Sequence, residues 1–314
     1  MLRNRKWLGT LAGGLAMVLG VFSSGWAATP GTHYNYGLEG VTGATAPPPG
    51  WHYRMYNLWY NPNEFKDNNG NTAPGNTELD VFASAQRIIH VTTIKILGAD
   101  YFYDFVFPLL DQDFSTVTPN GVFSDSHSFT LGDIEIEPFG LAWHQPRWDA
   151  VFALAVVLPT GHFEGDEPAS PGLGYWSGRL TLGGTYYFDD KKTWSASVLT
   201  RTLINGEQED TEVRPGSELV AEYGVGKEFT VNNIWMIRPG LTGASYWQFS
   251  DDSKDNLAYG IVADQHKRAH AAGAEINVFY LPMLFQVNLR YLQEYGVENG
   301  PEESRFIATL TKSF

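Results

Sequence analysis

After residue 50, apolar and polar residues alternate with a period of two along most of the chain, and helical periodicity is rare. In the segment 284–295, for example, Phe285, Val287 and Leu289 share one face, whereas Asn288 and Arg290 lie on the other. Alternation of this kind predicts β-strands with one apolar and one polar face. We predict twelve strands, over residues 51–60, 79–96, 98–108, 129–143, 149–158, 177–188, 194–205, 216–229, 233–249, 266–280, 284–295 and 304–314.

The connections between these strands alternate regularly between long and short. The long ones are residues 61–78, 109–128, 159–176, 206–215, 250–265 and 296–303, and the short ones are 97, 144–148, 189–193, 230–232 and 281–283. Outer-membrane barrels have short periplasmic turns and longer outer loops. The pattern therefore predicts an all-β fold, a transmembrane antiparallel β-barrel of about 12 strands in the bacterial outer membrane. A secreted soluble β-protein is the alternative, and the segments 79–96 and 149–158 fit the alternation poorly.

Aromatic residues gather at both ends of the predicted strands. The periplasmic ends carry Trp51, Phe188, Trp194, Phe229, Trp235, Tyr280, Phe285 and Phe314, and the outer ends carry Trp59, Trp176, Trp247, Tyr291 and Phe306. Two such belts are typical of barrels whose rings lie at the lipid headgroups. The terminal Phe314, with Phe306, Ala308 and Leu310 in phase behind it, resembles the C-terminal signature of outer-membrane barrels. This resemblance implies recognition of the last strand by the barrel assembly machinery.

Composition supports a membrane protein and excludes several other classes. Aromatic residues make up 14% of the 314 residues and charged residues only 18%, which is unusual for a soluble enzyme. The formal net charge of −14 argues against nucleic-acid binding, which needs basic surfaces for the phosphates. The absence of cysteine excludes disulfide frameworks, thiol nucleophiles and cysteine metal sites.

The N-terminus has two parts. Residues 1–27 combine Arg3, Arg5 and Lys6 with an apolar run and small residues before a cleavage point near Ala27, which predicts a secretory signal peptide. Residues 28–50 are rich in Gly and Pro and precede the barrel, residues 51–314. This segment is either a periplasmic linker or a plug inside the barrel. The residues that would form the plug are Tyr34, Tyr36, Pro47, Pro48 and Pro49.

Alternation also predicts which charged side chains face the lumen. They are Arg54, Arg179, Arg201, Arg238, Arg290, Glu135, Glu137, Glu218, Glu222, Glu275 and Glu294. These groups either pair across the lumen and brace the wall, or form a selectivity lining. Twelve strands predict a narrow lumen, because eight strands are filled by side chains and sixteen leave a wide channel.

The six long connections contain 20 acidic and three basic residues. Such loops repel anions from the mouth, which favours neutral or apolar solutes. They could also bind the divalent cations that bridge lipopolysaccharide, so outer-membrane lipid and lipopolysaccharide are the expected surroundings.

No arrangement of residues in the sequence points to catalysis. The eight histidines are scattered. Ser126-His127-Ser128 has Asp125 beside it, but adjacent residues on an extended chain point to opposite sides, so they do not form a triad by adjacency. His266 and His270 lie about 13 Å apart on a strand, too far for one metal ion. We therefore expect no enzyme activity, no cofactor and no metal site.

Several short motifs together resemble one family. They are the segment 36–50, Lys66-Asp67 with Gly70, Gly132-Asp133 with Pro138, Trp143-His144, Pro159-Thr160-Gly161, Gly174-Tyr175-Trp176-Ser177, Trp194-Ser195 and the stretch 248–252. Their order resembles the phenol meta-pathway degradation-like family of outer-membrane transporters, often encoded near aromatic degradation genes. The resemblance implies a channel for small hydrophobic, aromatic compounds in the outer membrane of a Gram-negative bacterium. The alternatives are a general narrow porin, a structural barrel with a closed lumen and a lipid-acting barrel enzyme.

Overall fold

The computed structural model describes residues 31–62, 64–73, 75–118 and 121–314. The predicted signal peptide, residues 1–27, lies outside the described residues. In the described part of the chain, no helix has the length and apolar character that a membrane span requires.

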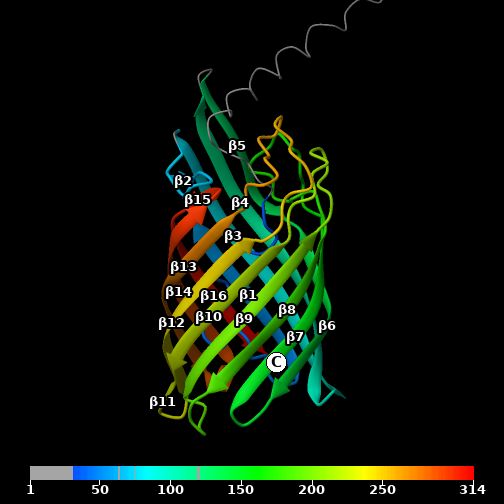
Figure 1. The fold of residues 1–314 in the computed structure, drawn as a ribbon. Helices are drawn as coiled ribbons and strands as arrows, with labels where there is room; N and C mark the ends of the chain where they lie inside the picture. Colours follow the sequence, from blue (N-terminus) through cyan, green and yellow to red (C-terminus); the bar gives the residue numbers. More distant parts are fainter. Residues whose placement is uncertain (1–30, 63, 74, 119–120) are drawn as a thin grey trace, which may run out of the picture.

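Twelve strands form one closed antiparallel barrel (Figure 1). They are β1 (Gly50–Tyr60), β3 (Thr77–Ile96), β4 (Ala99–Thr118), β6 (Ile134–His144), β7 (Trp148–Leu158), β8 (Ser177–Tyr187), β9 (Trp194–Asn205), β10 (Glu218–Lys227), β12 (Trp235–Gln248), β13 (Arg268–Tyr280), β14 (Phe285–Glu298) and β16 (Ser304–Ser313). Each strand pairs with its neighbours along the chain, and β1 pairs with β16 to close the ring. The predicted number of strands and the fold class are confirmed.

The connection predicted over residues 109–128 is wrong. Residues 109–118 continue β4, and residues 121–131 form β5 (Gly121–Leu131), which pairs only with β4. This hairpin extends above the rim of the barrel (Figure 1). Apolar and polar residues do not alternate cleanly here, because Phe114 and Thr116 share one face of β4 and Val117 lies on the other, so the period-two pattern did not predict this part of the strand.

Short elements complete the two ends. β2 (Glu64–Lys66) pairs with β15 (Gly300–Glu302) at the end with the long loops, so two predicted loops contain strand. At the other end, β11 (Phe229–Val231) extends the hairpin of β10 and β12, and the 3-10 helix η3 (Leu281–Met283) joins β13 to β14. We call these the long-loop end and the short-turn end.

The single strand predicted over residues 129–143 is interrupted at Gly132 and Asp133. The Asp133 carboxylate accepts hydrogen bonds from the backbone nitrogens of Gly161, at 2.9 Å, and Leu173, at 2.8 Å. The chain leaves the sheet here because this carboxylate organises the loop that follows β7. β6 begins at the next residue, Ile134.

Side chains that point out of the barrel are mostly apolar, and aromatic rings mark both rims. Trp51, Trp148, Trp194 and Trp235 are 40–48% exposed at the short-turn end. At the long-loop end, Trp59 packs against Phe82 and Phe306, with ring centroids 5.1 and 5.5 Å away. These two belts are those expected of a wall that faces lipid.

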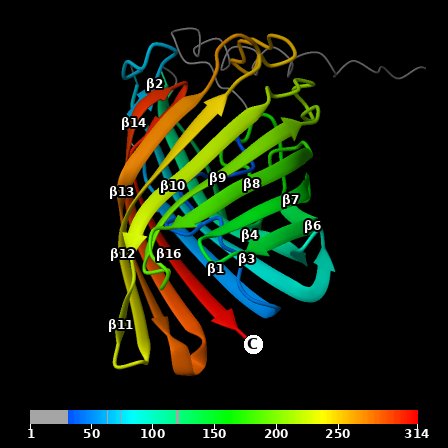
Figure 2. The same cartoon turned by 60° about the horizontal axis from the view of Figure 1, so that its bottom comes forward.

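The described part of the N-terminal segment, residues 31–50, passes through the lumen from one end to the other (Figure 2). At the long-loop end, the backbone oxygen of Gly31 accepts a hydrogen bond of 2.5 Å from the Tyr175 hydroxyl. At the short-turn end, the backbone oxygen of Pro48 lies 2.8 Å from Nε2 of His52, and the amide of Phe314 donates to Trp51 beside it. Of the two places weighed for this segment, its described residues occupy the barrel interior.

The occluded lumen as the candidate functional site

The first residues of the segment are fixed to the wall by polar side chains near the long-loop end. The hydroxyl of Thr32 donates to Oε2 of Glu218 over 2.6 Å. The ring of His33 lies between Asp133, 3.0 Å from its Nε2, and Ser177, 2.7 Å from its Nδ1. Asp133 thus links the segment to the loop 159–176.

Two tyrosines follow, and both are buried against the wall. The Tyr34 hydroxyl donates to Glu222 over 2.6 Å, and the guanidinium of Arg201 lies 4.3 Å from its ring centre. The Tyr36 hydroxyl donates to Glu294, and the guanidinium of Arg305 lies 4.0 Å from its ring centre. In each tyrosine, a carboxylate accepts a hydrogen bond from the hydroxyl and a guanidinium stacks on the ring face, so both the hydroxyl and the ring are held in place.

The middle of the segment is held through its backbone by acidic residues of the wall. Glu222 accepts hydrogen bonds from the amides of Gly37, at 3.2 Å, and Glu39, at 2.6 Å. Gly37 has a φ of +88°, a conformation that L side chains rarely adopt. At Gly40, an added Cβ would lie only 1.7 Å from Oε2 of Glu275, so only glycine fits. The backbone conformation at Gly37 and the close contact at Gly40 thus explain the glycines at these two positions.

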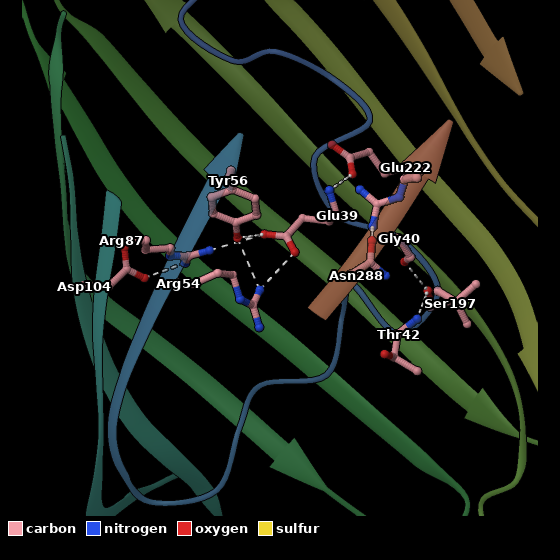
Figure 3. Close-up of polar contacts among 12 residues, drawn as sticks. Glu39, Gly40, Thr42, Arg54, Tyr56, Arg87, Asp104, Ser197, Glu222 and Asn288 are labelled. Atoms are coloured by element: carbon pink, nitrogen blue, oxygen red, sulfur yellow. Dashed lines mark hydrogen bonds and ion pairs between the residues drawn. The ribbon is translucent and has the colours of Figure 1, made fainter. Parts of the chain in front are cut away.

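Glu39 is the central charge of the lumen (Figure 3). Its side chain is 8% exposed, and its oxygens lie 3.1 Å from Arg54, 3.3 Å from Arg87 and 3.4 Å from Arg201. The hydroxyl of Tyr56 donates to the same carboxylate over 2.8 Å. One carboxylate of the N-terminal segment therefore joins cations from three strands, β1, β3 and β9.

Further ion pairs extend this layer around the wall. Arg87 also contacts Asp104 at 2.5 Å and Glu137 at 3.3 Å. Arg179 contacts Glu137 at 2.9 Å and also binds Glu135. On the opposite wall, Arg290 contacts Glu275 at 2.9 Å. Buried charges are stable only when they are paired, and each of these groups contacts a group of opposite charge.

All the charged residues predicted to face the lumen point into the barrel. The buried ones are Arg179, Arg201, Arg290, Glu135, Glu137, Glu218, Glu222, Glu275 and Glu294, and the partly exposed ones are Arg54 and Arg238. Most belong to the layer around Glu39, whereas Arg238 pairs with Glu228 at 3.6 Å, towards the short-turn end. Of the residues predicted for a plug, Tyr34 and Tyr36 lie in the lumen, Pro47 lines a small cavity, and Pro48 and Pro49 are exposed at the short-turn end.

Four charged residues of this layer escaped the sequence prediction: Glu39, Arg87, Asp104 and Arg305. Arg87 lies in β3, whose inner face carries Val81, Ala83 and Ala85 while its outer face carries Ser84 and Gln86. The usual assignment of polar residues to the lumen is inverted there. Every second residue from Leu79 to Arg87 lies on the same face of β3. Counting by position alone, and ignoring polarity, would have placed Arg87 on the inner face with Val81.

The inverted face of β3 lines a cavity of about 420 Å³ near the long-loop end. Its apolar surface comes from Leu58, Leu79, Val81, Ala83, Ala85, Val106, Pro108, Leu110 and Val157. Opposite this surface lie Tyr34, Tyr36 and Leu38 of the N-terminal segment. Its size and largely apolar lining are those of pockets that bind small organic molecules.

A second cavity, of about 50 Å³, lies closer to the short-turn end and is lined by Ala46, Pro47 and Phe102. Glu39, Arg87 and Arg201 line both cavities. This ionic cluster is therefore the partition between them.

Comparison with known proteins identifies the family. The model of the family described as "Putative MetA-pathway of phenol degradation" matches residues 62–310. The chain belongs to this family. The resemblance noted in the sequence is thereby confirmed. None of the curated proteins matches the chain.

Solved structures share the fold of this family member. The COG4313 outer membrane channel from Pseudomonas putida F1 is 15% identical, with a TM-score of 0.68 over 90% of this chain and 100% of that chain. The transport unit of the autotransporter AIDA-I from Escherichia coli is 10% identical, with a TM-score of 0.50 over 96% and 97% of the two chains. At these identities the likeness establishes an outer-membrane barrel fold.

Proposed function

We propose that this protein is an outer-membrane channel for small hydrophobic compounds, and in particular for aromatic ones. The observation that carries the proposal is the apolar cavity of about 420 Å³ inside a barrel whose lumen is otherwise charged. An apolar inner wall does not favour polar solutes, because contact between apolar surface and a polar solute yields no hydrophobic free energy. The family description, which names phenol degradation, supports the aromatic class.

The acidic loops at the mouth favour the same class of solute. They repel carboxylates and phosphates but leave neutral molecules unaffected. A neutral aromatic molecule can therefore reach the cavity and replace water at its apolar wall. Its onward passage requires the partition at Glu39 to shift, so the structure described here is the closed state of the proposed channel.

The proposal is tested by uptake into cells that lack general porins and express this protein. We expect phenol to enter faster than benzoate, which has a similar size but carries a negative charge. Val81→Asp, which places a charge in the cavity wall, should lower phenol uptake several-fold, while the matched control Val81→Leu should not. Heat-modifiable migration of the folded barrel verifies that both variants are assembled.

The second candidate is a structural barrel with a closed lumen, which the continuous partition favours. It predicts the same phenol uptake with and without the protein. Equal uptake of phenol, benzoate and a small sugar would instead identify a general porin. Either result contradicts the proposed selectivity.

A further inference from the structure

Outside the lumen, two histidines and one glutamate converge at the long-loop end. His127 belongs to β5, whereas His162 and Glu167 belong to the loop 159–176. Their nitrogen and oxygen atoms all lie within 4.8 Å of one another. Oε2 of Glu167 is 3.0 Å from Nε2 of His162 and 3.3 Å from Nε2 of His127. Three ligands suited to a transition metal, two imidazoles and one carboxylate, thus lie close together.

From this geometry we propose that His127, His162 and Glu167 form a binding site for a divalent transition-metal ion such as Zn²⁺. Zinc bonds to histidine nitrogen and carboxylate oxygen at about 2.0–2.2 Å, which places the ligand atoms of a tetrahedral site about 3.4 Å apart. The two short separations found here match that spacing. Calcium and magnesium prefer oxygen ligands, so two imidazoles select against them.

Further carboxylates surround the site. Oδ1 of Asp125 lies 3.8 Å from Nε2 of His127, and Oε1 of Glu164 lies 4.0 Å from Nε2 of His162. Either can supply the fourth ligand or bind a metal-coordinated water. Among the described residues, Nε2 of His127 is shielded from solvent and makes no hydrogen bond. A metal ion would satisfy this nitrogen.

Hydrogen bonds within the chain hold the backbone around the ligands. The amide of Gly172 donates to the His162 oxygen over 2.8 Å, which closes the loop at its base. The amide of Ala169 donates to Oδ2 of Asp125 over 2.8 Å, which joins the loop to β5. At Gly161, an added Cβ would lie 2.7 Å from the Cα of Gly172, so the two sides of the loop touch. Metal binding therefore requires only small side-chain movements.

The site has a structural consequence for the mouth of the barrel. The loop that carries His162 and Glu167 also carries Ser170, Pro171 and Leu173, which line the apolar cavity. A metal ion bridging this loop to the hairpin of β4 and β5 would hold that part of the cavity wall in place. This consequence rests on the proposed channel function, whereas the binding itself does not.

The binding is tested on metal-depleted, refolded protein in detergent. Titration calorimetry with ZnCl₂ should give one ion per chain, and CoCl₂ should give the visible absorption bands of a site with nitrogen ligands. His162→Ala and Glu167→Gln should each weaken zinc binding by about tenfold or more, since each removes a direct ligand. The control is His266→Asn, because His266 pairs with Asp251 at 2.7 Å in another loop.

Three outcomes would overturn the site: no zinc binding by the folded wild type, equal weakening in His266→Asn, or equal competition by Ca²⁺. The last would show general attraction to the acidic loops. Phenol uptake with and without Zn²⁺ is a separate measurement. If zinc binds but uptake does not respond, the site stands and its link to the cavity is refuted.

Discussion

At the scale of single residues, the lumen depends on a few buried charges that satisfy one another across distant parts of the chain. Glu39 is the clearest case, because three arginines from three strands converge on its carboxylate. Removing one partner of a buried ion pair costs more free energy than the intact pair contributes to stability, because the remaining charge stays desolvated and unpaired. The N-terminal segment is thus held by electrostatics as well as by shape.

Glu39→Gln keeps the size of the side chain and removes its charge. We expect the free energy that keeps residues 31–50 docked to fall by about 3–5 kcal/mol, because three arginines of the lumen lose their shared carboxylate. Ionic conductance in planar bilayers and proteolysis of the segment should both increase. Glu64→Gln is the control, since the side chain of Glu64 is 52% exposed beside Lys66. Unchanged conductance in Glu39→Gln would show that the segment is held by other contacts.

Lys267, just before β13, gives a prediction about pH. Burial lowers the pKa of Lys267 from 10.5 to about 8, although the carboxylates of Glu218 and Asp252 oppose the shift. Between these two pH values the unfolded chain binds the proton and the folded barrel does not, so the free energy of unfolding should rise with pH. Reversible unfolding in lipid vesicles should show this rise from pH 8 towards 10. Lys267→Gln should lack it, and an identical slope in the variant would refute the assignment.

At the scale of elements, strands that line the apolar cavity depart from the usual pattern of an outer-membrane barrel. β3 and β7 carry apolar residues on their inner faces as well, for example Val81 in β3 and Val157 in β7. The outer face of β3 carries polar side chains instead, and these are hydrogen-bonded: the hydroxyl of Ser84 donates to Asn57 over 2.9 Å. In β14, apolar and polar residues separate between the two faces from Phe285 to Tyr291, whereas Leu292 points into the lumen next to Gly37.

Leu289→Arg tests the outer face of β14, where Leu289 is 41% exposed. We expect a loss of about 2–4 kcal/mol in the free energy of unfolding in vesicles if the side chain lies near the bilayer midplane. Phe285→Arg, on the same face but next to the turn at η3, should lose only about 0–1 kcal/mol. Equal losses would mean that β14 does not cross the bilayer at the assumed depth.

At the scale of the whole molecule, the chain forms its barrel around its own N-terminal segment. Residues 31–50 contact the wall on several sides, for example at Glu218 in β10, Glu294 in β14 and Arg54 in β1. The barrel itself closes through backbone pairing of β1 and β16. The wall and its occluding segment are therefore separable in principle. In the proposed channel, the segment is the part that closes the lumen.

Deleting residues 29–46 should raise ionic conductance and reduce the preference for phenol over benzoate, while the strands remain folded. The reason is that the partition at Glu39 is removed together with the rings of Tyr34 and Tyr36 that face the cavity. Replacing the same residues with a Gly/Ser chain of equal length separates loss of these side chains from loss of the tether. A folded deletion variant with wild-type conductance would exclude a role for the segment in closing the lumen.

The sequence alone determined the barrel, because the period-two alternation and the alternation of long and short connections are local features. Both can be read from the sequence without knowing any tertiary contact. It also determined the inward position of residues such as Arg290 and Glu275, which follows from the phase of one strand. It failed locally where tertiary contacts overrode the pattern. Gly132 and Asp133 interrupt a predicted strand because the carboxylate binds a loop 28 and 40 residues further along the chain.

Only the tertiary structure decided the path of residues 31–50, the convergence of three arginines on Glu39 and the grouping of His127 with His162 and Glu167. The physical reason is that each depends on strand register and on distances across the lumen or between loops. The local sequence does not determine these distances. The apolar cavity is of the same kind: its wall comes from β1, β3, β4 and β7, and its opposite side comes from a segment that no periodicity placed inside the barrel.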